Sequence, residues 1–177
     1  MTRKRPPSRD DLTDHDLTDV ERAVTSVVGE LDVDLDAMHA VANVFRVEAA
    51  VRNYMQRNVL VADDLSWTAF VALWVLWVWG DQESRHLAEG CNVSRATITG
   101  VVRTLEARGF VSRQPGAEDG RVVVVGLTRA GRRIISRLYP VFNAHEAALT
   151  SGLTTAERRQ LAQLLRKVLR RASDTAR

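Results

Sequence analysis

Apolar residues recur at helical spacing through the first half of the chain, and they predict three helices. A short helix over residues 18–31 precedes a long helix over 36–62 and a third over 67–79. Thr18 and Glu21 stand at capping-box spacing, so we expect the first helix to begin at Thr18. The third helix is apolar almost all round, which predicts a buried, central position, and it is too short to cross a bilayer.

The pattern of the second half predicts a β-hairpin inserted between helices. Four consecutive valines at 122–125 favour a pleated surface, and the polar, glycine-containing stretch 116–120 before them is typical of a hairpin loop. The predicted elements are helices over 84–90 and 95–108, strands over 110–115 and 121–127, and helices over 128–150 and from Thr154 onward. We therefore expect a mainly α protein with five or six helices and one small hairpin.

The charges are unevenly distributed along the chain. The 25 Lys and Arg residues exceed the 22 Asp and Glu residues by only three. Residues 1–36 carry 5 basic and 10 acidic side chains, whereas residues 84–135 carry 9 and 4, and residues 136–177 carry 8 and 3. A near-neutral total thus hides a basic second half, which predicts an anionic partner.

Composition excludes several classes of protein. A hydrophobic fraction of 45% is too high for a disordered chain, and a single Cys cannot form an intramolecular disulfide. The basic residues near the N-terminus are not followed by an apolar run, so this segment does not resemble a signal peptide. We therefore expect a cytoplasmic protein with no membrane partner. The four His are scattered and predict no metal site, and no arrangement of nucleophile, base or phosphate loop predicts a catalytic site or a cofactor. We therefore do not expect an enzyme.

Residues 84–108 have the layout of a helix-turn-helix. Asn92 stands in the turn, where it tolerates a left-handed backbone, and Ser94 is placed to cap the second helix. The side expected to pack inward holds Ile98, Val101, Val102 and Leu105, and the opposite face shows Arg95, Thr97, Thr99, Gly100 and Arg103. Hydroxyl and guanidinium groups on that face suit a helix whose N-terminal end enters a DNA major groove.

With the hairpin that follows it, this stretch resembles the MarR family of bacterial transcription regulators. The motifs that carry the resemblance are Leu87-Ala88-Glu89, Val93-Ser94-Arg95-Ala96-Thr97-Ile98-Thr99, Leu105-Glu106-Ala107-Arg108-Gly109-Phe110-Val111, Asp119-Gly120-Arg121 and Leu127-Thr128-Arg129-Ala130-Gly131. The resemblance covers roughly residues 37–172 and is sharpest over 84–131. It implies a winged helix-turn-helix fold in a homodimer, with an effector pocket between the dimerisation helices and the DNA-binding lobe.

The resemblance also implies a division of the chain into four parts. Residues 1–36 form an N-terminal tail and an extra helix, and 37–65 a dimerisation helix. Residues 66–133 form the winged helix-turn-helix lobe, and 134–177 the C-terminal dimerisation helices. In some members of the family, such an N-terminal extension adds to the dimer interface.

Position by position, the resemblance implies contacts with DNA. The expected residues are Ser94, Arg95, Thr97, Thr99, Gly100, Arg103, Arg113, Asp119 and Arg121. Arg121 is expected at the wing tip, oriented by Asp119, and Arg113 on the first wing strand is expected to bind a phosphate. Arg103 stands where the family commonly has an acidic residue, and it is either a phosphate contact or a solvated side chain.

The effector expected from the resemblance is a small aromatic or lipophilic molecule. The pocket is expected between helices 37–62, 67–79 and 128–150, with Phe45, Trp67, Phe70 and Trp74 as its candidate residues. For the tryptophans, core packing is the competing explanation.

Three other features leave alternatives open. Cys91 is either an oxidant sensor or a packed side chain, and its place in the helix-turn-helix favours packing. The pairs Arg132-Arg133 and Arg170-Arg171 either follow the DNA backbone or are solvated. The basic excess of residues 136–177 either extends the DNA footprint or pairs with the acidic N-terminal segment across the dimer.

Together, these residues predict a homodimeric, sequence-specific DNA-binding transcription regulator. We expect a ligand-responsive repressor on a pseudo-palindromic operator, with half-sites about one helical turn apart. The alternative is a winged helix that binds other proteins and has lost DNA binding. The basic, hydroxyl-rich face and Arg121 favour DNA, because a protein-binding module does not need them.

Overall fold

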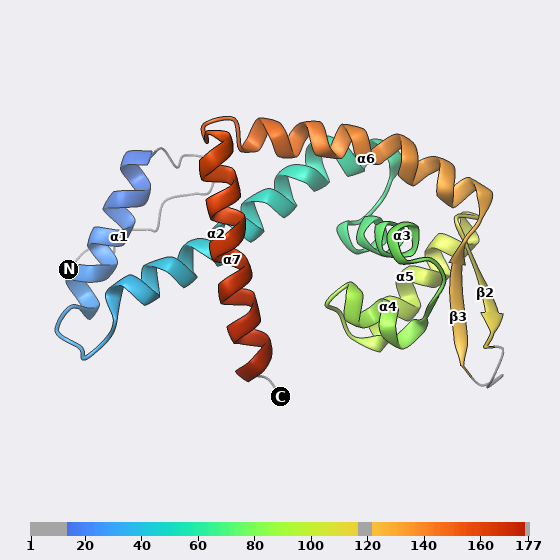
Figure 1. Cartoon of the computed structure of the whole chain (residues 1–177), viewed down its shortest axis with the longest axis horizontal. Helices are drawn as coiled ribbons and strands as arrows, with labels where there is room; N and C mark the ends of the chain where they lie inside the picture. The colour runs from blue at the N-terminus through green and yellow to red at the C-terminus, as the bar shows by residue number, and fades with distance from the viewer. Residues whose placement is uncertain (1–13, 117–121, 176–177) are drawn as a thin grey trace, which may run out of the picture. The chain divides into compact units, whose positions relative to one another are not determined.

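The computed structural model describes residues 14–116 and 122–175, which fall into two compact units divided between Arg52 and Asn53. The α-helices of this part of the chain are α1 (Asp14–Val28), α2 (Leu35–Met55), α3 (Trp67–Trp79), α4 (Ser84–Gly90), α5 (Arg95–Ala107), α6 (Arg129–Leu149) and α7 (Thr155–Thr175) (Figure 1). A π-helical turn, Gln56–Leu60, and a 3-10 turn, Val61–Asp63, continue α2. The described strands are β1 (Gln82–Glu83), β2 (Val111–Pro115) and β3 (Val123–Leu127).

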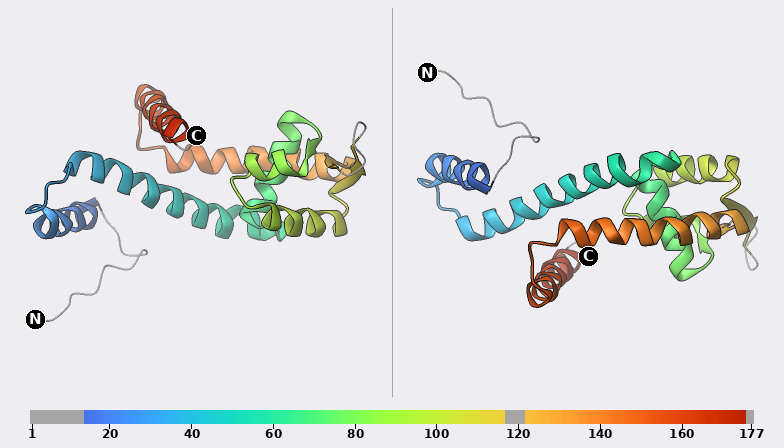
Figure 2. Two further views of the ribbon diagram at one scale, coloured as in Figure 1. Left: turned by 90° about the horizontal axis from the view of Figure 1, so that it is seen from below. Right: turned by 90° about the horizontal axis from the view of Figure 1, so that it is seen from above.

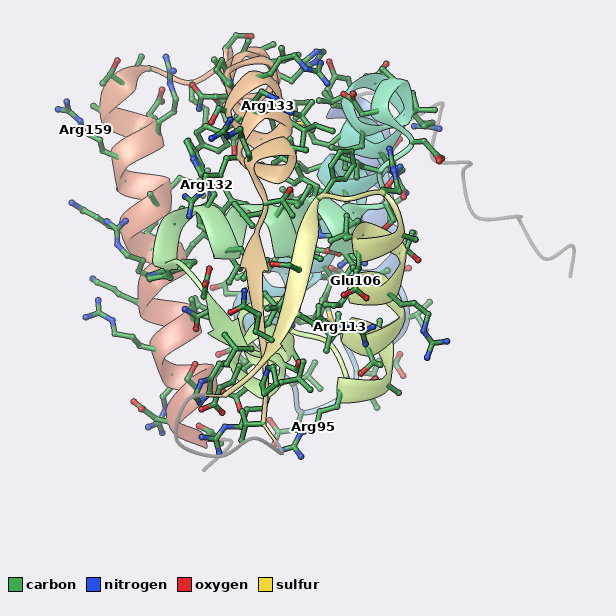
Figure 3. The ribbon with its side chains drawn as sticks, turned by 90° about the vertical axis from the view of Figure 1, so that its right-hand side faces the viewer. Arg95, Glu106, Arg113, Arg132, Arg133 and Arg159 are labelled. Carbon is green, nitrogen blue, oxygen red and sulfur yellow. The ribbon has the colours of Figure 1, made fainter. Side chains whose placement is uncertain are left out.

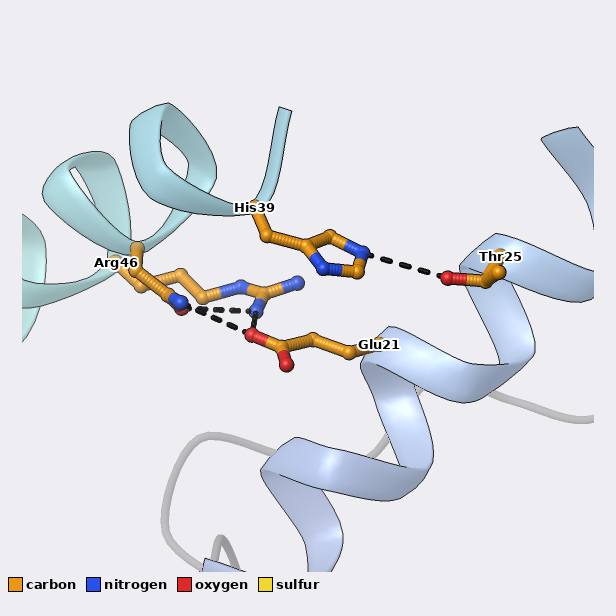
Figure 4. Close-up of polar contacts among 5 residues, drawn as sticks. Glu21, Thr25, His39 and Arg46 are labelled. Atoms are coloured by element: carbon orange, nitrogen blue, oxygen red, sulfur yellow. Dashed lines mark hydrogen bonds and ion pairs between the residues drawn. The ribbon is translucent and has the colours of Figure 1, made fainter. Parts of the chain in front are cut away.

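The first unit pairs α1 with the N-terminal part of α2 through a polar seam (Figure 4). The Glu21 carboxylate accepts a hydrogen bond of 2.9 Å from the Asn43 amide and lies 3.7 Å from the Arg46 guanidinium. Thr25 Oγ1 lies 3.4 Å from His39 Nε2. The extra helix expected from the sequence is therefore present and is held to α2.

The predicted start of this extra helix is wrong. Thr18 lies inside α1, which already includes Asp14, so Thr18 is not its N-cap. The four preceding residues contain no Gly or Pro to stop a helix, and the capping-box spacing alone did not set the boundary.

The second unit is built around α3. Six of its 13 residues are buried, which confirms the central position predicted from its apolar circumference: Ala69, Phe70, Ala72, Leu73, Val75 and Leu76. α3 contacts α4, α5, α6 and β3. Figure 2 shows α3, α4, α5 and the strands gathered at one end of α6, with α7 beyond its other end.

The wing is a three-stranded antiparallel sheet in the order β1-β3-β2, rather than the two-stranded hairpin predicted. Gln82 and Glu83 pair with Val125 and Val124, and β2 pairs with β3 along its whole length. The sequence could not predict β1, because a two-residue strand is too short to show alternation. Completely buried Val125 ties the wing to the core of the lobe.

The predicted helix boundaries in the second unit are largely confirmed by their caps. Ser66, Ser94 and Thr128 each accept a hydrogen bond from a backbone N–H of the first turn of the following helix. Thr154 and Glu157 form a reciprocal capping box at the start of α7, with contacts of 2.7 and 3.2 Å. Asn92 has the left-handed conformation expected of the turn, with φ of 51°.

The Thr-x-x-Gly motif at the start of α6 has a packing explanation. Thr128 Oγ1 accepts from the Gly131 N–H at 3.0 Å and donates to the Gly109 carbonyl at 2.7 Å. A Cβ at position 131 would overlap the carbonyl oxygen of Phe110. Glycine is therefore required for α6 to pack this closely against the end of α5 and the wing.

A clamp holds the turn that precedes α3. Asp64 has φ of 49°, and the Arg108 guanidinium donates to the carbonyls of Asp63 and Asp64 at 2.7 and 2.6 Å. The Asp63 carboxylate also pairs with Arg137 of α6. The Arg108 guanidinium also lies over the Phe110 ring, 4.9 Å from its centroid. These contacts fix the C-terminal end of α5 within the lobe.

Across residues 14–116 and 122–175, no single helix has both the length and the apolar composition needed to cross a membrane. One bent pair, residues 35–63 with α3, meets those two criteria jointly, but α3 is the buried core helix just described.

Candidate DNA-binding surface

The outer face of α5 is exposed, as the sequence predicts. Ile98, Val102 and Leu105 are buried against the lobe. The exposed residues of the opposite face are Ser94, Arg95, Thr97, Thr99, Gly100 and Arg103. The amphipathic pattern has therefore placed every predicted recognition-helix contact on one accessible surface.

Local hydrogen bonds orient the hydroxyl groups of this face. Ser94 Oγ accepts from the Thr97 N–H at 3.1 Å and lies 2.8 Å from Thr97 Oγ1. Thr99 Oγ1 donates to the Arg95 carbonyl at 2.7 Å. The Thr99 hydroxyl hydrogen is thus already used, so this side chain presents acceptor lone pairs and a methyl group to a partner.

Gly100 is the one residue of this face whose identity the fold does not explain. A Cβ built at this position meets nothing within 4 Å, and φ is not positive. Glycine within an exposed helix costs about 1 kcal/mol relative to alanine. Neither packing nor backbone conformation offsets this cost, which is consistent with a partner that approaches the α5 backbone closely.

A groove of ≈ 420 Å³ separates α5 from the wing. Three arginines line it: Arg85 of α4, Arg95 at the start of α5, and Arg113 of β2. The groove also contains Glu83, Ser84, Ile98, Thr99, Val102, Val122 and Val123. The groove therefore runs between the exposed face of α5 and the wing, and its lining is rich in hydrogen-bond donors.

Two of these arginines are paired with carboxylates of the lobe. Arg113 Nη2 lies 2.5 Å from Glu106 Oε2, and Arg85 Nε lies 2.7 Å from Glu83 Oε2. Figure 3 shows Glu106 and Arg113 side by side between α5 and the wing, with Arg95 nearer the lower end of the lobe. The hydrogen bond from Arg113 lowers the pKa of Glu106 and raises that of Arg113, so both groups are charged at neutral pH. Sequence reasoning missed this partner of Arg113.

The remaining predicted contacts are distributed differently. Arg103 is exposed on α5, while Asp119 and Arg121 lie outside the described residues. Arg132 and Arg133 are exposed on α6, and Figure 3 shows them at the opposite end of the lobe from Arg95. Their position favours the solvated alternative over a backbone contact continuous with the α5 surface.

Three of the four candidate effector residues belong to the second unit, and they have different aromatic neighbours. Trp67 and Phe70 lie against Phe142 of α6, with ring centroids 6.1 and 4.4 Å from it. Trp74 instead meets Trp79 edge-on at 5.2 Å. Phe45 belongs to the first unit and is 70% exposed.

Two further polar and aromatic residues lie in the same unit as this aromatic group. Tyr54 Oη and His145 Nδ1 are 2.9 Å apart and part-buried, and they join the end of α2 to α6. Phe142 could have been found from the sequence, because it continues the apolar stripe of Ile135 and Leu138. The Tyr54–His145 contact has no local signal, because 91 residues separate the two side chains.

Cys91 is half-buried rather than fully buried. Desolvation raises the pKa of its thiol to about 11. A thiol that stays protonated at neutral pH reacts slowly with oxidants, which favours packing over sensing.

Comparison with known proteins decides the family. The family model described as the MarR family matches residues 65–123. The chain is also 40% identical over 136 residues to the uncharacterized HTH-type transcriptional regulator YwaE of Bacillus subtilis, a match covering 77% of this chain and 80% of the relative. The chain belongs to the MarR family. This member is therefore a DNA-binding regulator of transcription, and the resemblance identified from its motifs is confirmed.

Solved structures support the same MarR fold. The PcaV transcriptional regulator from Streptomyces coelicolor, solved with its natural ligand, matches with a TM-score of 0.68 and 25% identity, over 79% of this chain and 97% of PcaV. BpsR of Bordetella bronchiseptica, whose DNA binding is regulated by 6-hydroxynicotinic acid, matches with a TM-score of 0.64 and 26% identity, over 75% of this chain and 98% of BpsR. The predicted winged helix-turn-helix class is confirmed, with the added strand β1.

Proposed function

We propose that this MarR-family chain is a homodimeric, ligand-responsive repressor that binds a pseudo-palindromic operator. The observation that carries the proposal is the exposed face of α5. This face holds Arg95, two threonines and Gly100, a glycine that neither packing nor backbone conformation requires, and it adjoins a groove lined by arginines. The N-terminal part of α5 enters a major groove, where Arg95 and the hydroxyl groups read base edges. The wing, with Asp119 and Arg121, follows the flanking minor groove.

The dimer is proposed from two unpartnered apolar faces. On α2, Val41, Val44 and Phe45 are exposed. On α7, the exposed apolar residues are Leu161, Leu164, Leu165, Val168 and Leu169. Apolar faces of this extent mark interaction surfaces, and a second copy that covers them sets two α5 helices about one helical turn of DNA apart. We propose residues 37–65 and 134–177 as dimerisation segments and 66–133 as the DNA-binding lobe.

The effector is proposed to be a small aromatic molecule. The aromatic group of Trp67, Phe70 and Phe142 offers stacking partners, and Tyr54 and His145 offer polar groups that fix orientation. BpsR responds to 6-hydroxynicotinic acid, which is a molecule of this chemistry. The ligand weakens DNA binding only if it binds more tightly to a dimer whose α5 helices are spaced unlike the operator half-sites than to the DNA-binding dimer.

Replacing Gly100 with alanine tests whether DNA approaches this face. Gly100→Ala should raise the free energy of unfolding by about 0.5–1 kcal/mol, because it removes the entropic cost of glycine in a helix. It should also weaken binding to duplex DNA, because the new Cβ stands between the helix backbone and its partner. Thermal unfolding and fluorescence anisotropy measure the two effects.

Gly152→Ala is the matched control. A Cβ added at position 152 likewise meets nothing within 4 Å, but Gly152 lies in the turn before α7 and not on α5. It should leave DNA binding unchanged. Equal DNA affinities for Gly100→Ala and the unmodified chain would contradict the placement of DNA on this face, and failure of the unmodified chain to bind duplex DNA would favour a protein-binding winged helix.

A further inference from the structure

The groove between α5 and the wing contains three arginines, but not all of their positive charge is available to a partner. Of its three arginines, Arg85 and Arg113 are each paired with a carboxylate. Among the residues that the structure describes, no carboxylate pairs with Arg95. The lobe therefore places two carboxylates, Glu83 and Glu106, beside a surface proposed to bind phosphate.

The pair between Glu106 and Arg113 is placed to break when DNA arrives. It joins the last turns of α5 to the first wing strand, and the two side chains are 33% and 43% exposed. An ion pair this accessible is weak, because water screens both charges. The closest contact joins Arg113 Nη2 to Glu106 Oε2, and a guanidinium has five N–H donors, more than one carboxylate oxygen can use, so Arg113 can also meet a phosphate.

We propose that Glu106 is a specificity-determining residue that suppresses binding to DNA of arbitrary sequence by neutralising Arg113. This inference rests on the proposed DNA-binding function. In a loosely held, non-specific complex, attraction is mostly between charges at a distance, so a neutral pair contributes little. In a closely docked operator complex, a phosphate reaches hydrogen-bonding distance of Arg113 and replaces Glu106 as its partner. Glu106 thus lowers non-specific affinity more than specific affinity.

The test is a salt titration on a 30-base-pair duplex of random sequence. Glu106→Gln should bind this DNA about threefold to tenfold more tightly than the unmodified chain at ~100 mM salt, because Arg113 becomes a free cation. The slope of log affinity against log salt should steepen by about 0.9 for each protomer. Circular dichroism and thermal unfolding check that the variant is folded.

Two comparisons separate this role from a general effect of removing an acid. Glu89→Gln makes the same charge change at an exposed position on α4 and should alter affinity less than twofold. In an Arg113→Gln background, Glu106→Gln should give no gain. A gain for Glu89→Gln equal to that for Glu106→Gln, or a gain that persists without Arg113, overturns the role of Glu106. Absence of duplex binding by every protein, including the unmodified chain, would instead overturn the proposed function itself.

Discussion

Leu165→Glu should convert the dimer into monomers and remove high-affinity operator binding. Leu165 lies in the apolar stripe of α7 and is 42% exposed in the single chain. Burying one leucine contributes about 1.5–3 kcal/mol, and a two-fold interface counts the residue twice. A carboxylate placed there must also be desolvated, so we expect dimer affinity to fall by at least about 100-fold. Sedimentation equilibrium across a range of concentrations measures the change.

Gln163→Glu provides the control for this experiment. Gln163 is exposed on α7, two residues before Leu165 and therefore about 160° around the helix from it. It receives the same carboxylate, but the dimer should persist. A dimer equally stable in both variants would contradict the assignment of the α7 stripe to the interface.

Arg95→Ala should weaken duplex DNA binding by at least about 30-fold without changing the dimer. Arg95 is exposed in the first turn of α5 and lines the groove toward the wing. A bidentate arginine contact with a base edge contributes about 1–3 kcal/mol, and each dimer loses two of them. Fluorescence anisotropy with labelled DNA gives the affinity, and sedimentation confirms the dimer.

The matched control for Arg95 is Arg133→Ala, which removes the same charge at the opposite end of the lobe (Figure 3). Its affinity for DNA should change less than threefold. If the two variants lose equal affinity, net charge alone explains the binding, and the position of Arg95 at the N-terminal end of α5 has no special role.

Local sequence signals predicted much of the lobe correctly. Ser66, Ser94 and Thr128 begin helices because their side chains accept hydrogen bonds from nearby backbone N–H groups. Helical periodicity likewise predicted the exposed face of α5. Capping and periodicity both depend on residues only a few positions apart, so the sequence shows them directly. Thr18 shows the limit of such signals, because a capping pattern inside a longer helix looks the same in sequence.

The features that sequence reasoning missed depend on residues far apart in the chain. β1 exists because Gln82 and Glu83 meet β3 some 40 residues later, and two residues carry no periodic pattern. Asp63 directly follows the predicted helix 36–62, and no local pattern indicates that Arg108 and Arg137 hold it in a clamp. These contacts depend on tertiary placement, which periodicity does not encode.

The pair between Glu106 and Arg113 changes the meaning of the charge distribution. The sequence shows a basic excess over residues 84–135, and the family resemblance implies that Arg113 binds a phosphate. In the folded lobe, this arginine is already engaged. The positive charge available to DNA is therefore smaller than a count of residues suggests, and its distribution is set by which carboxylates the fold brings beside which arginines.

The α5 face and the wing are proposed to bind the DNA backbone and grooves as a dimer. The most direct test is the salt dependence of binding between the unmodified chain and duplex DNA from 50 to 200 mM salt, measured by fluorescence anisotropy. If the dimer neutralises ~6–10 phosphates, affinity should fall by about 10³-fold or more across this range. Absence of binding, or an affinity that does not change with salt, would contradict the claim.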